Sequence, residues 1–260
     1  MNMKDAVAIV TGSSSGIGAA VARLFAEQGC HVVINYSRNE EGAQAVARDC
    51  QALGVKTLVH QADVANDDDC RALVAATLDA FGRLDILINN AGTTRFCAHH
   101  DLEGLSKEDF LDIYSVNTVG AYQMARAAES AMREAGTAHL VNMASIAGLS
   151  GVGSSIAYAA SKGALLTLTK SLARVLGPQI RVNAICPGFV QGEWLEKGLG
   201  KEAYAALLKK TKAGAALNDA ASPESIAQAV LGLVIGGDLT TGEAILVDGG
   251  SHLSAGGVRH

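Results

Sequence analysis

Tyr158 and Lys162 are the two residues of this sequence whose types and spacing most directly suggest chemistry. They stand four positions apart in a stretch that we expect to be helical, so their Cβ atoms lie about 5–6 Å apart on one helix face. A free phenol titrates at about 10, and a neighbouring ammonium favours the phenolate. Such a pair can donate a proton to a carbonyl oxygen that receives hydride, or remove one from an alcohol. The spacing alone is frequent by chance, so other motifs must support it.

A glycine-rich segment with the sequence TGSSSGIG follows the first apolar run and opens into a helical pattern. Its glycines let the backbone turn sharply and approach a pyrophosphate, whose charge then lies at a helix N-terminus. The spacing G-x-x-x-G-x-G differs from the commoner G-x-G-x-x-G, but the strand–turn–helix context is the one that a dinucleotide site requires. The alternative is a turn without a ligand. We expect phosphate contacts from Gly12, Ser14, Ser15, Gly16, Ile17 and Gly18.

The end of the second expected strand indicates which dinucleotide binds. An acid there would bind the ribose 2′-hydroxyl of NAD, whereas an arginine accommodates the 2′-phosphate of NADP. This strand end carries Ser37 and Arg38, and the first acids, Glu40 and Glu41, fall inside the next helix. Arg38 can bind a phosphate bidentately and Ser37 can donate to it. We therefore predict NADP(H) rather than NAD(H), the alternative being that Arg38 is an ordinary solvated arginine.

The elements that position these residues follow from hydrophobic periodicity. Short apolar runs, several of them nearly continuous, alternate with longer helical patterns, which indicates strands covered on both faces and right-handed crossovers. We expect one α/β domain over residues 1–260, a Rossmann-type doubly wound parallel sheet of about seven strands with helices on both faces. A segment at 192–218 fits no strand and is expected to be a small helical lid. Strands are expected at 7–11, 31–35, 56–61, 85–89, 139–143, 181–185 and 244–247, and helices at 17–28, 40–53, 67–81, 107–133, 158–176 and 223–235.

Composition excludes several classes of function. With 49% apolar and 18% charged residues the chain has a globular balance. Its formal charge of −5 argues against a nucleic-acid partner. No apolar run approaches the ~20 residues that cross a membrane, and the N-terminal run is too short for a signal peptide, so we expect a cytoplasmic protein. The five dispersed cysteines are expected to be reduced thiols, without a disulfide or a metal.

Taken together, the motifs resemble those of the short-chain dehydrogenase/reductase (SDR) family, in particular its 3-oxoacyl-carrier-protein reductase-like members. The match runs from residue 7 to 250, in the family's order and spacing. This resemblance implies a seven-stranded doubly wound sheet, hydride transfer to or from C4 of a nicotinamide, and a homotetramer. The matching segments are TGSSSGIG at 11–18, Asp63-Val64, Asn89-Asn90-Ala91-Gly92, Asn117, Ser145, Tyr158-Ala-Ala-Ser-Lys162 and Pro187-Gly188.

The resemblance also assigns catalytic roles. Tyr158 would be the general acid/base, and Lys162 would lower its pKa and hold the nicotinamide ribose hydroxyls. Ser145 would hydrogen-bond the substrate oxygen, and Asn117 would anchor a water that links Lys162 to solvent. The simpler alternatives are that Ser145 only caps a turn and that Asn117 is a polar residue inside a helix.

Cofactor contacts are implied in the same way. Asp63 resembles the partner of the adenine amide, although it could instead cap the following helix, for which Asp67 is the better candidate. Pro187 and Gly188 would pass over the nicotinamide face. The other implied contacts are Val64, Asn90, Ala91, Gly92 and Val190, while Asn89 would steady the central sheet.

The sequence departs from the family pattern at two places. Gly192 stands where many members have a threonine that binds the nicotinamide carboxamide, so that contact must come from backbone groups or from Gln191. The turn before the fifth strand, 134–138, has the sequence EAGTA where carrier-dependent reductases are usually basic, and it would attract an acidic carrier poorly.

We therefore expect an enzyme that interconverts a small secondary alcohol and a ketone. The alternatives are a carrier-protein-dependent 3-oxoacyl reductase of fatty-acid synthesis and a redox-inactive nucleotide-binding regulator, which would not need Tyr158 or Lys162. Trp194, at the start of the expected lid, is either a helix anchor or a wall over the substrate. His99 and His100 lack a third metal ligand at suitable spacing, so we expect a solvated loop and no metal site.

Overall fold

The computed structural model describes residues 1–254 of the chain, so the last six residues of the predicted domain, 255–260, lie outside the described part. Within residues 1–254 seven parallel strands form a single sheet in the order β3-β2-β1-β4-β5-β6-β7. All seven expected strands are present, with small shifts at their ends. They are β1 Val7–Val10, β2 His31–Tyr36, β3 Thr57–Gln61, β4 Ile86–Asn89, β5 Ala138–Met143, β6 Ile180–Pro187 and β7 Ala244–Val247.

The order of the strands reverses between β1 and β4, which are paired in the middle of the sheet. The crevice at such a switch point, outside the carboxyl ends of the strands, is where ligands bind in open α/β sheets. The two strands are short and apolar (VAIV and ILIN) and every residue in them is buried, because helices cover both faces. The predicted doubly wound α/β fold is confirmed.

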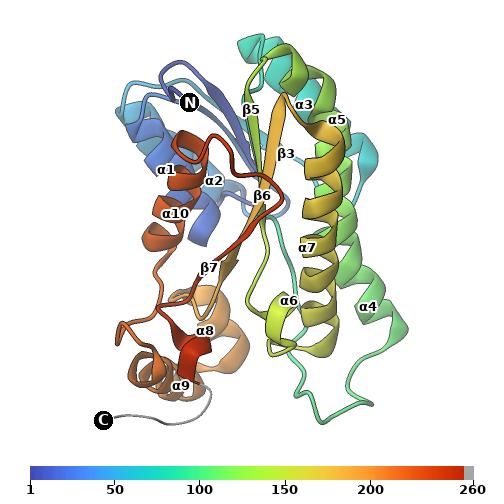
Figure 1. The fold of residues 1–260 in the computed structure, drawn as a ribbon, viewed down its shortest axis with the longest axis vertical. Helices are drawn as coiled ribbons and strands as arrows, with labels where there is room; N and C mark the ends of the chain where they lie inside the picture. Colours follow the sequence, from blue (N-terminus) through green and yellow to red (C-terminus); the bar gives the residue numbers. More distant parts are fainter. Residues whose placement is uncertain (255–260) are drawn as a thin grey trace.

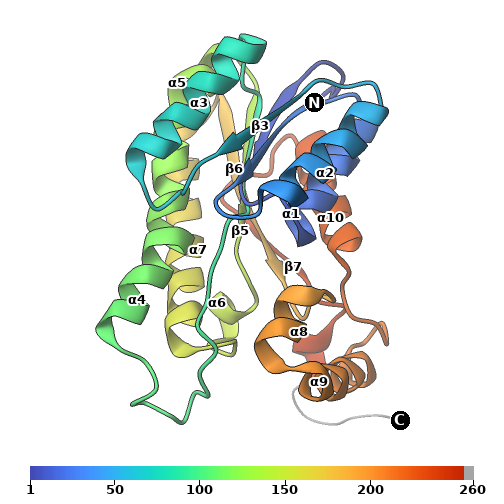
Figure 2. The same cartoon turned by 180° about the vertical axis from the view of Figure 1, so that it is seen from behind.

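Two layers of helices cover the sheet. Figures 1 and 2 show α1, α2 and α10 on one face and α3, α5 and α7 on the other. The helices are α1 Gly16–Glu27, α2 Glu40–Ala52, α3 Asp67–Phe81, α4 Lys107–Tyr114, α5 Ala121–Glu134, α6 Ala147–Ser150, α7 Ile156–Leu176, α8 Glu193–Leu199, α9 Lys201–Gly214 and α10 Pro223–Ile235, with a 3₁₀ turn at Ser251–Ser254.

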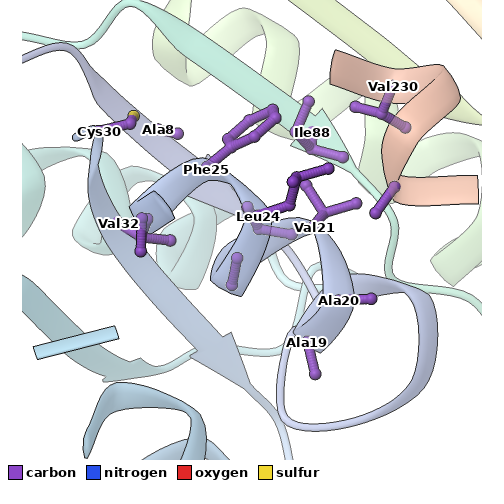
Figure 3. Packing of buried hydrophobic residues seen from close by; sticks show 14 of the residues in the cluster. Ala8, Ala19, Ala20, Val21, Leu24, Phe25, Cys30, Val32, Ile88 and Val230 are labelled. Atoms are coloured by element: carbon purple, nitrogen blue, oxygen red, sulfur yellow. The ribbon is translucent and has the colours of Figure 1, made fainter. Parts of the chain in front are cut away.

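The apolar face of α1 packs into the core and thereby fixes the position of the glycine-rich turn between β1 and α1. Val21, Leu24 and Phe25 are buried against β1, β2 and α10, and Phe25 has no exposed surface (Figure 3). Each such side chain contributes about 1.5–3 kcal/mol on burial. This packing fixes the N-terminus of α1 directly beyond β1, where the glycine-rich turn lies.

The helix expected at 107–133 is interrupted. A π-helical segment, Ser115–Gly120, separates α4 from α5. A Cβ on Gly120 would lie only 2.8 Å from Cγ2 of Val64, so the segment approaches the chain after β3 very closely. Such widened turns occur preferentially at functional sites, and this one carries Asn117. Sequence periodicity did not predict it, because a one-residue shift in hydrogen bonding hardly changes the apolar pattern.

The expected lid is helical and consists of α8 and α9, joined at Gly200 with φ +79°. All side chains of these two helices are at least partly exposed. Both helices lie at the same end of the molecule as α6 (Figures 1 and 2). None of the helices in residues 1–254 has the length and apolar character needed to cross a membrane.

Candidate active site

The glycine-rich turn between β1 and α1 has the geometry of an anion cradle. Gly12 and Gly16 have φ of +62° and +56°, which favours glycine. A Cβ on Gly12 would lie 2.9 Å from Cα of Ala91, so the turn packs directly on the chain after β4. The N-cap of α1, Ser15, makes no side-chain capping bond within residues 1–254. The first N–H groups of α1 therefore remain available to an anion.

Asn35 holds this turn and was missed by the sequence analysis. Its side-chain oxygen accepts from the N–H of Gly12 at 3.0 Å, and its side-chain nitrogen donates to the carbonyl of Ala62 at 3.0 Å. The N–H of Ser13 in turn donates to the Asn35 carbonyl at 2.9 Å. One buried amide thus joins the ends of β2 and β3 to the turn. The available signal was an asparagine in an otherwise apolar strand, since a buried polar group requires partners.

The segment after β4 locks onto the same turn. The side-chain nitrogen of Asn90 donates to the carbonyls of Thr11 (2.9 Å) and Gly12 (3.1 Å). The hydroxyl of Thr11 accepts from the N–H groups of Asn90 and Ala91. Gly18 lies beneath this network, because a Cβ on it would come within 2.5 Å of the Asn90 amide nitrogen. Gly18 therefore supports the turn.

A cleft of about 2110 Å³ runs along the carboxyl ends of the strands. Most predicted site residues line it, whereas Ser14, Gly18 and Asn117 do not. The carbonyl of Ser14 faces α2, where a Cβ on Gly42 would approach it to 2.6 Å. The predicted residues that line the cleft are Gly12, Ser15, Gly16, Ile17, Ser37, Arg38, Asp63, Val64, Asn90, Ala91, Gly92, Ser145, Tyr158, Lys162, Pro187, Gly188 and Val190.

One end of the cleft carries Arg38, which is exposed and forms no ion pair or hydrogen bond with any residue of 1–254. Its guanidinium is therefore free to meet a ligand. Asp63 lies nearby on the cleft wall, and its side chain accepts from the N–H of Ala65 at 3.0 Å. The cap of α3 is neither Asp63 nor Asp67 but Asn66, whose side chain accepts from the N–H of Asp68.

The predicted catalytic residues converge between β5 and α7. Ser155 caps α7 by accepting from the N–H of Tyr158, which places Tyr158 in the first turn of the helix. Lys162 is buried, and its ammonium donates to the carbonyl of Met143 at 2.7 Å. The ammonium nitrogen lies 5.6 Å from the centre of the Tyr158 ring. Ser145 follows β5, accepts from the N–H of Ala147 and lines the same cleft as Tyr158.

Asn117 lies behind this group, in the π-helical segment. Its side-chain nitrogen donates to the Ser161 hydroxyl at 3.0 Å, and that hydroxyl donates to the carbonyl of Tyr158 at 2.7 Å. Its side-chain oxygen accepts from the N–H of Thr93. A Cβ on Gly92 would lie 3.4 Å from that oxygen and 3.6 Å from the Lys162 nitrogen. Asn117 therefore positions α7 and the chain after β4; its role toward a bound water stays a prediction.

Burial dominates the acid–base properties of the pair. It raises the pKa of Tyr158 to about 12, against a smaller lowering by the hydrogen bond from Ser145. It lowers the pKa of Lys162 to about 8. The expected lowering of the Tyr158 pKa by Lys162 is not found, because Lys162, with its pKa lowered to about 8, is already neutral in the range where the phenol titrates. The phenol is neutral at pH 7 and can serve as a proton donor.

Comparisons with known proteins identify the family of this chain. The family model described as "Enoyl-(Acyl carrier protein) reductase" matches residues 12–252. A crystal structure from Burkholderia xenovorans, of a protein assigned to the short-chain dehydrogenases/reductases, superposes with a TM-score of 0.89 at 40% identity and covers 95% of this chain and 98% of that chain. The chain belongs to the short-chain dehydrogenase/reductase family. It is accordingly an NAD(P)-dependent oxidoreductase.

Its SDR relatives act on different compounds. A protein assigned as ketoacyl reductase 2 of the granaticin polyketide synthase from Streptomyces violaceoruber is 41% identical over 95% of this chain and 96% of its own length. A 3-oxoacyl-[acyl-carrier-protein] reductase from Synechocystis is 33% identical over 94% and 96%. Xylitol dehydrogenase, solved with bound NAD⁺, is 26% identical with a TM-score of 0.87 and coverage of 96% and 100%.

The segment after β6 is built differently from the SDR pattern with threonine. The N–H of Gly192 donates to the hydroxyl of Tyr204 on α9 at 3.2 Å. The side-chain nitrogen of Gln191 donates to the carbonyl of Ala220 at 2.9 Å. The Gln191 amide nitrogen and the Gly192 N–H are thus both engaged within the chain, and a carboxamide contact from other backbone groups stays a prediction. Gly188 packs against the start of the C-terminal segment, since a Cβ on it would lie 2.6 Å from Cβ of Asp248.

Trp194 belongs to the cleft wall. Its ring centre lies 6.2 Å from that of Tyr158 and 5.7 Å from that of Phe96. About half of the side chain is exposed, so a helix anchor buried on the sheet is excluded. His99, from the loop where a metal was considered, has its Nε2 atom 3.1 Å from the Gly153 carbonyl and also lines the cleft.

Proposed function

We propose that this protein is an NADP(H)-dependent oxidoreductase that interconverts a secondary alcohol and a ketone, with Tyr158 as the general acid/base. One observation carries the proposal. Ser145, Tyr158 and Lys162 converge on one cleft whose other end is formed by a glycine cradle at a free helix N-terminus.

The chain's own residues fit a dinucleotide. Glycines stand where the backbone must approach a phosphate. A Cβ on Gly16 would have no neighbour within 4 Å, so the space there is open, whereas Gly12 packs directly on Ala91. The uncapped first turn of α1 would hold the pyrophosphate. Ser37 and the free Arg38 would hold a 2′-phosphate, and no carboxylate ends β2 to repel it. These features favour NADP over NAD.

When bound, the nicotinamide supplies or accepts a hydride at its ring carbon C4. In the reductive direction the carbonyl carbon gains that hydride, and Tyr158 donates its hydroxyl proton to the carbonyl oxygen, so a ketone becomes a secondary alcohol. Ser145 donates a hydrogen bond to the same oxygen and stabilises the charge that develops there. Lys162 would hold the ribose hydroxyls and, near its lowered pKa, would return a proton toward Tyr158. Oxidation of the alcohol runs the same transfers backward.

A small free substrate is favoured over a carrier-bound one. The turn at 134–138 lacks basic residues, and the guanidinium of the adjacent Arg133 is engaged by Glu129, Gln179 and the Val175 carbonyl. A carrier-dependent 3-oxoacyl reductase is the second candidate, supported by the identity with the two ketoacyl reductases. By the same family resemblance we propose a homotetramer, and we propose a cytoplasmic location as the sequence analysis did.

The proposal is tested by measuring NADPH oxidation against free ketones and 3-oxoacyl thioesters. Tyr158→Phe keeps the ring and removes the proton, and we expect turnover to fall by about 10²–10⁴-fold. Retained dinucleotide affinity of this variant would show that the site is still folded. Comparable turnover by Tyr158→Phe would refute the mechanism. Dinucleotide binding without oxidation on any carbonyl would instead favour a redox-inactive regulator.

A further inference from the structure

The lid-side wall of the cleft is a row of three aromatic rings that ends at the catalytic tyrosine. Phe96 packs on Trp194 with ring centres 5.7 Å apart, and Trp194 packs on Tyr158 at 6.2 Å. The Phe96 ring also lies flush against the backbone of α8, because any Cβ on Gly198 would overlap it. Trp194 and Gly198 are four residues apart on one face of α8. Phe96 therefore fixes that face, and Trp194 with it, over the reacting centre.

This wall exposes apolar surface to the cleft. Val152 is 71% exposed, Trp194 49% and Leu207 39%, and all three line the cleft. Large apolar side chains that stay wet inside a concave site mark a ligand surface, and covering them is favourable by about 25 cal/mol per Å². Lys210, three residues after Leu207 on α9, also lines the cleft, and its side chain is exposed to solvent.

Three polar side chains on the same walls, those of Ser154, His99 and Gln191, are already engaged with protein partners. The Ser154 hydroxyl pairs with that of Thr94 at 2.7 Å. The Nε2 atom of His99 pairs with the Gly153 carbonyl at 3.1 Å. The Gln191 amide nitrogen donates to Ala220, as described above. A polyhydroxylated substrate would have to break these bonds or bury its hydroxyl groups without partners, which costs about 1–3 kcal/mol for each group.

From this pattern we infer the substrate class: a ketone or secondary alcohol whose reacting carbon is attached to a flat apolar body, aromatic or alicyclic, that lies against Trp194. The oxygen of that substrate meets Ser145 and Tyr158, and its ring covers the surface formed by Val152, Trp194 and Leu207. The inference rests on the proposed function and uses the same transfers, hydride to carbon and the Tyr158 proton to oxygen.

The first test compares kcat/KM for a bicyclic aromatic ketone with that for an open-chain polyhydroxy ketone at saturating NADPH. We expect the aromatic ketone to be preferred by at least about 10-fold, the lower range for hydrophobic pocket contacts. Trp194→Ala should lower the ratio of kcat/KM for the aromatic ketone to that for the polyhydroxy ketone by about 10–100-fold. Leu239→Ala, at a fully exposed position away from the cleft, should leave this ratio unchanged.

The second test reads binding without turnover. Trp194 is the only tryptophan of the sequence, so intrinsic fluorescence reports on this wall. We expect the aromatic alcohol to quench the fluorescence of the NADP⁺ complex in a saturable way and xylitol to have no effect. Turnover without a preference for the aromatic ketone would overturn the substrate class and leave the proposed function standing. Quenching without turnover of any carbonyl would support the apolar site and overturn the proposed function.

Discussion

The side-chain oxygen of Asn35 accepts a 3.0 Å hydrogen bond from the backbone N–H of Gly12, so the end of β2 holds the phosphate turn in place. The other end of the same amide donates to Ala62 beyond β3. Three neighbouring strands are therefore linked at the edge of the sheet where the dinucleotide is proposed to bind. The turn is held before any ligand arrives, and such preorganisation reduces the entropic cost of binding.

Asn35→Ala removes both bonds and leaves a donor and an acceptor unpaired. We expect the free energy of unfolding to fall by about 2–3 kcal/mol and the Kd for NADPH to rise roughly 10-fold. Urea unfolding and a binding titration measure the two effects. The matched control is Asn66→Ala, which removes the cap of α3 and should cost about 1 kcal/mol without changing the Kd. Equal Kd values for both variants would contradict the role of Asn35.

Two helical glycines should respond to alanine in opposite ways. At Gly18 the new Cβ would lie 2.5 Å from the Asn90 amide nitrogen and 2.7 Å from the Gly12 carbonyl oxygen. We expect Gly18→Ala to lower stability by about 1–3 kcal/mol and to weaken dinucleotide binding. Gly232 lies inside α10 with no such neighbour, so Gly232→Ala should raise stability by about 0.5–1 kcal/mol. Thermal or urea unfolding of both variants checks the pair, and destabilisation by Gly232→Ala would show that the local packing argument is wrong.

Arg38 should decide the choice of dinucleotide. Arg38→Asp replaces a free cation with a carboxylate that repels the 2′-phosphate and can accept from a ribose hydroxyl. We expect the ratio of kcat/KM for NADPH to that for NADH to fall by about 10–100-fold or more, in line with the loss of a charge-assisted bond. Arg48→Asp, on the exposed side of α2, should leave the ratio unchanged. An unmodified enzyme that already works faster with NADH would disprove the assignment.

His139 should make stability depend on pH. It is buried on β5, its Nε2 atom has no partner among residues 1–254, and burial together with the charge of Arg181 lowers its pKa from 6.5 to about 4. Between these values the unfolded chain binds a proton that the folded chain does not, so stability falls as the pH drops from 6.5 to 4. From pH 7 to 5 this contributes a loss of about 2 kcal/mol.

Urea unfolding at the two pH values measures this loss. His139→Leu should remove it, whereas His100→Leu, at an exposed position, should lose as much stability as the unmodified protein. The same pH dependence in His139→Leu would show that other groups cause it.

Much of this protein is determined by patterns that span only a few residues. Apolar runs such as VAIV and ILIN, separated by amphipathic stretches, predicted all seven strands and most of the helices, because strand and helix periods depend on neighbouring side chains. Glycine spacing predicted the turn at Gly12 and Gly16 for the same local reason. The four-residue interval also placed Tyr158 and Lys162 on one helix face.

The tertiary structure alone decided what depends on contacts between distant segments. Asn35 became a site residue because β2, β3 and the first turn meet at it. Asn117 was predicted from the sequence, but its contact with Ser161 on α7 follows from the π-helical segment that carries it. The raised pKa of Tyr158 reflects burial, which no spacing reveals, and the place of Trp194 in the cleft wall depends on the packing of α8 against Phe96. Desolvation and side-chain packing depend on all neighbours in space, most of which are distant in the sequence. The sequence therefore identified Tyr158 and Trp194 as candidate site residues but could not predict the burial and contacts that determine their properties.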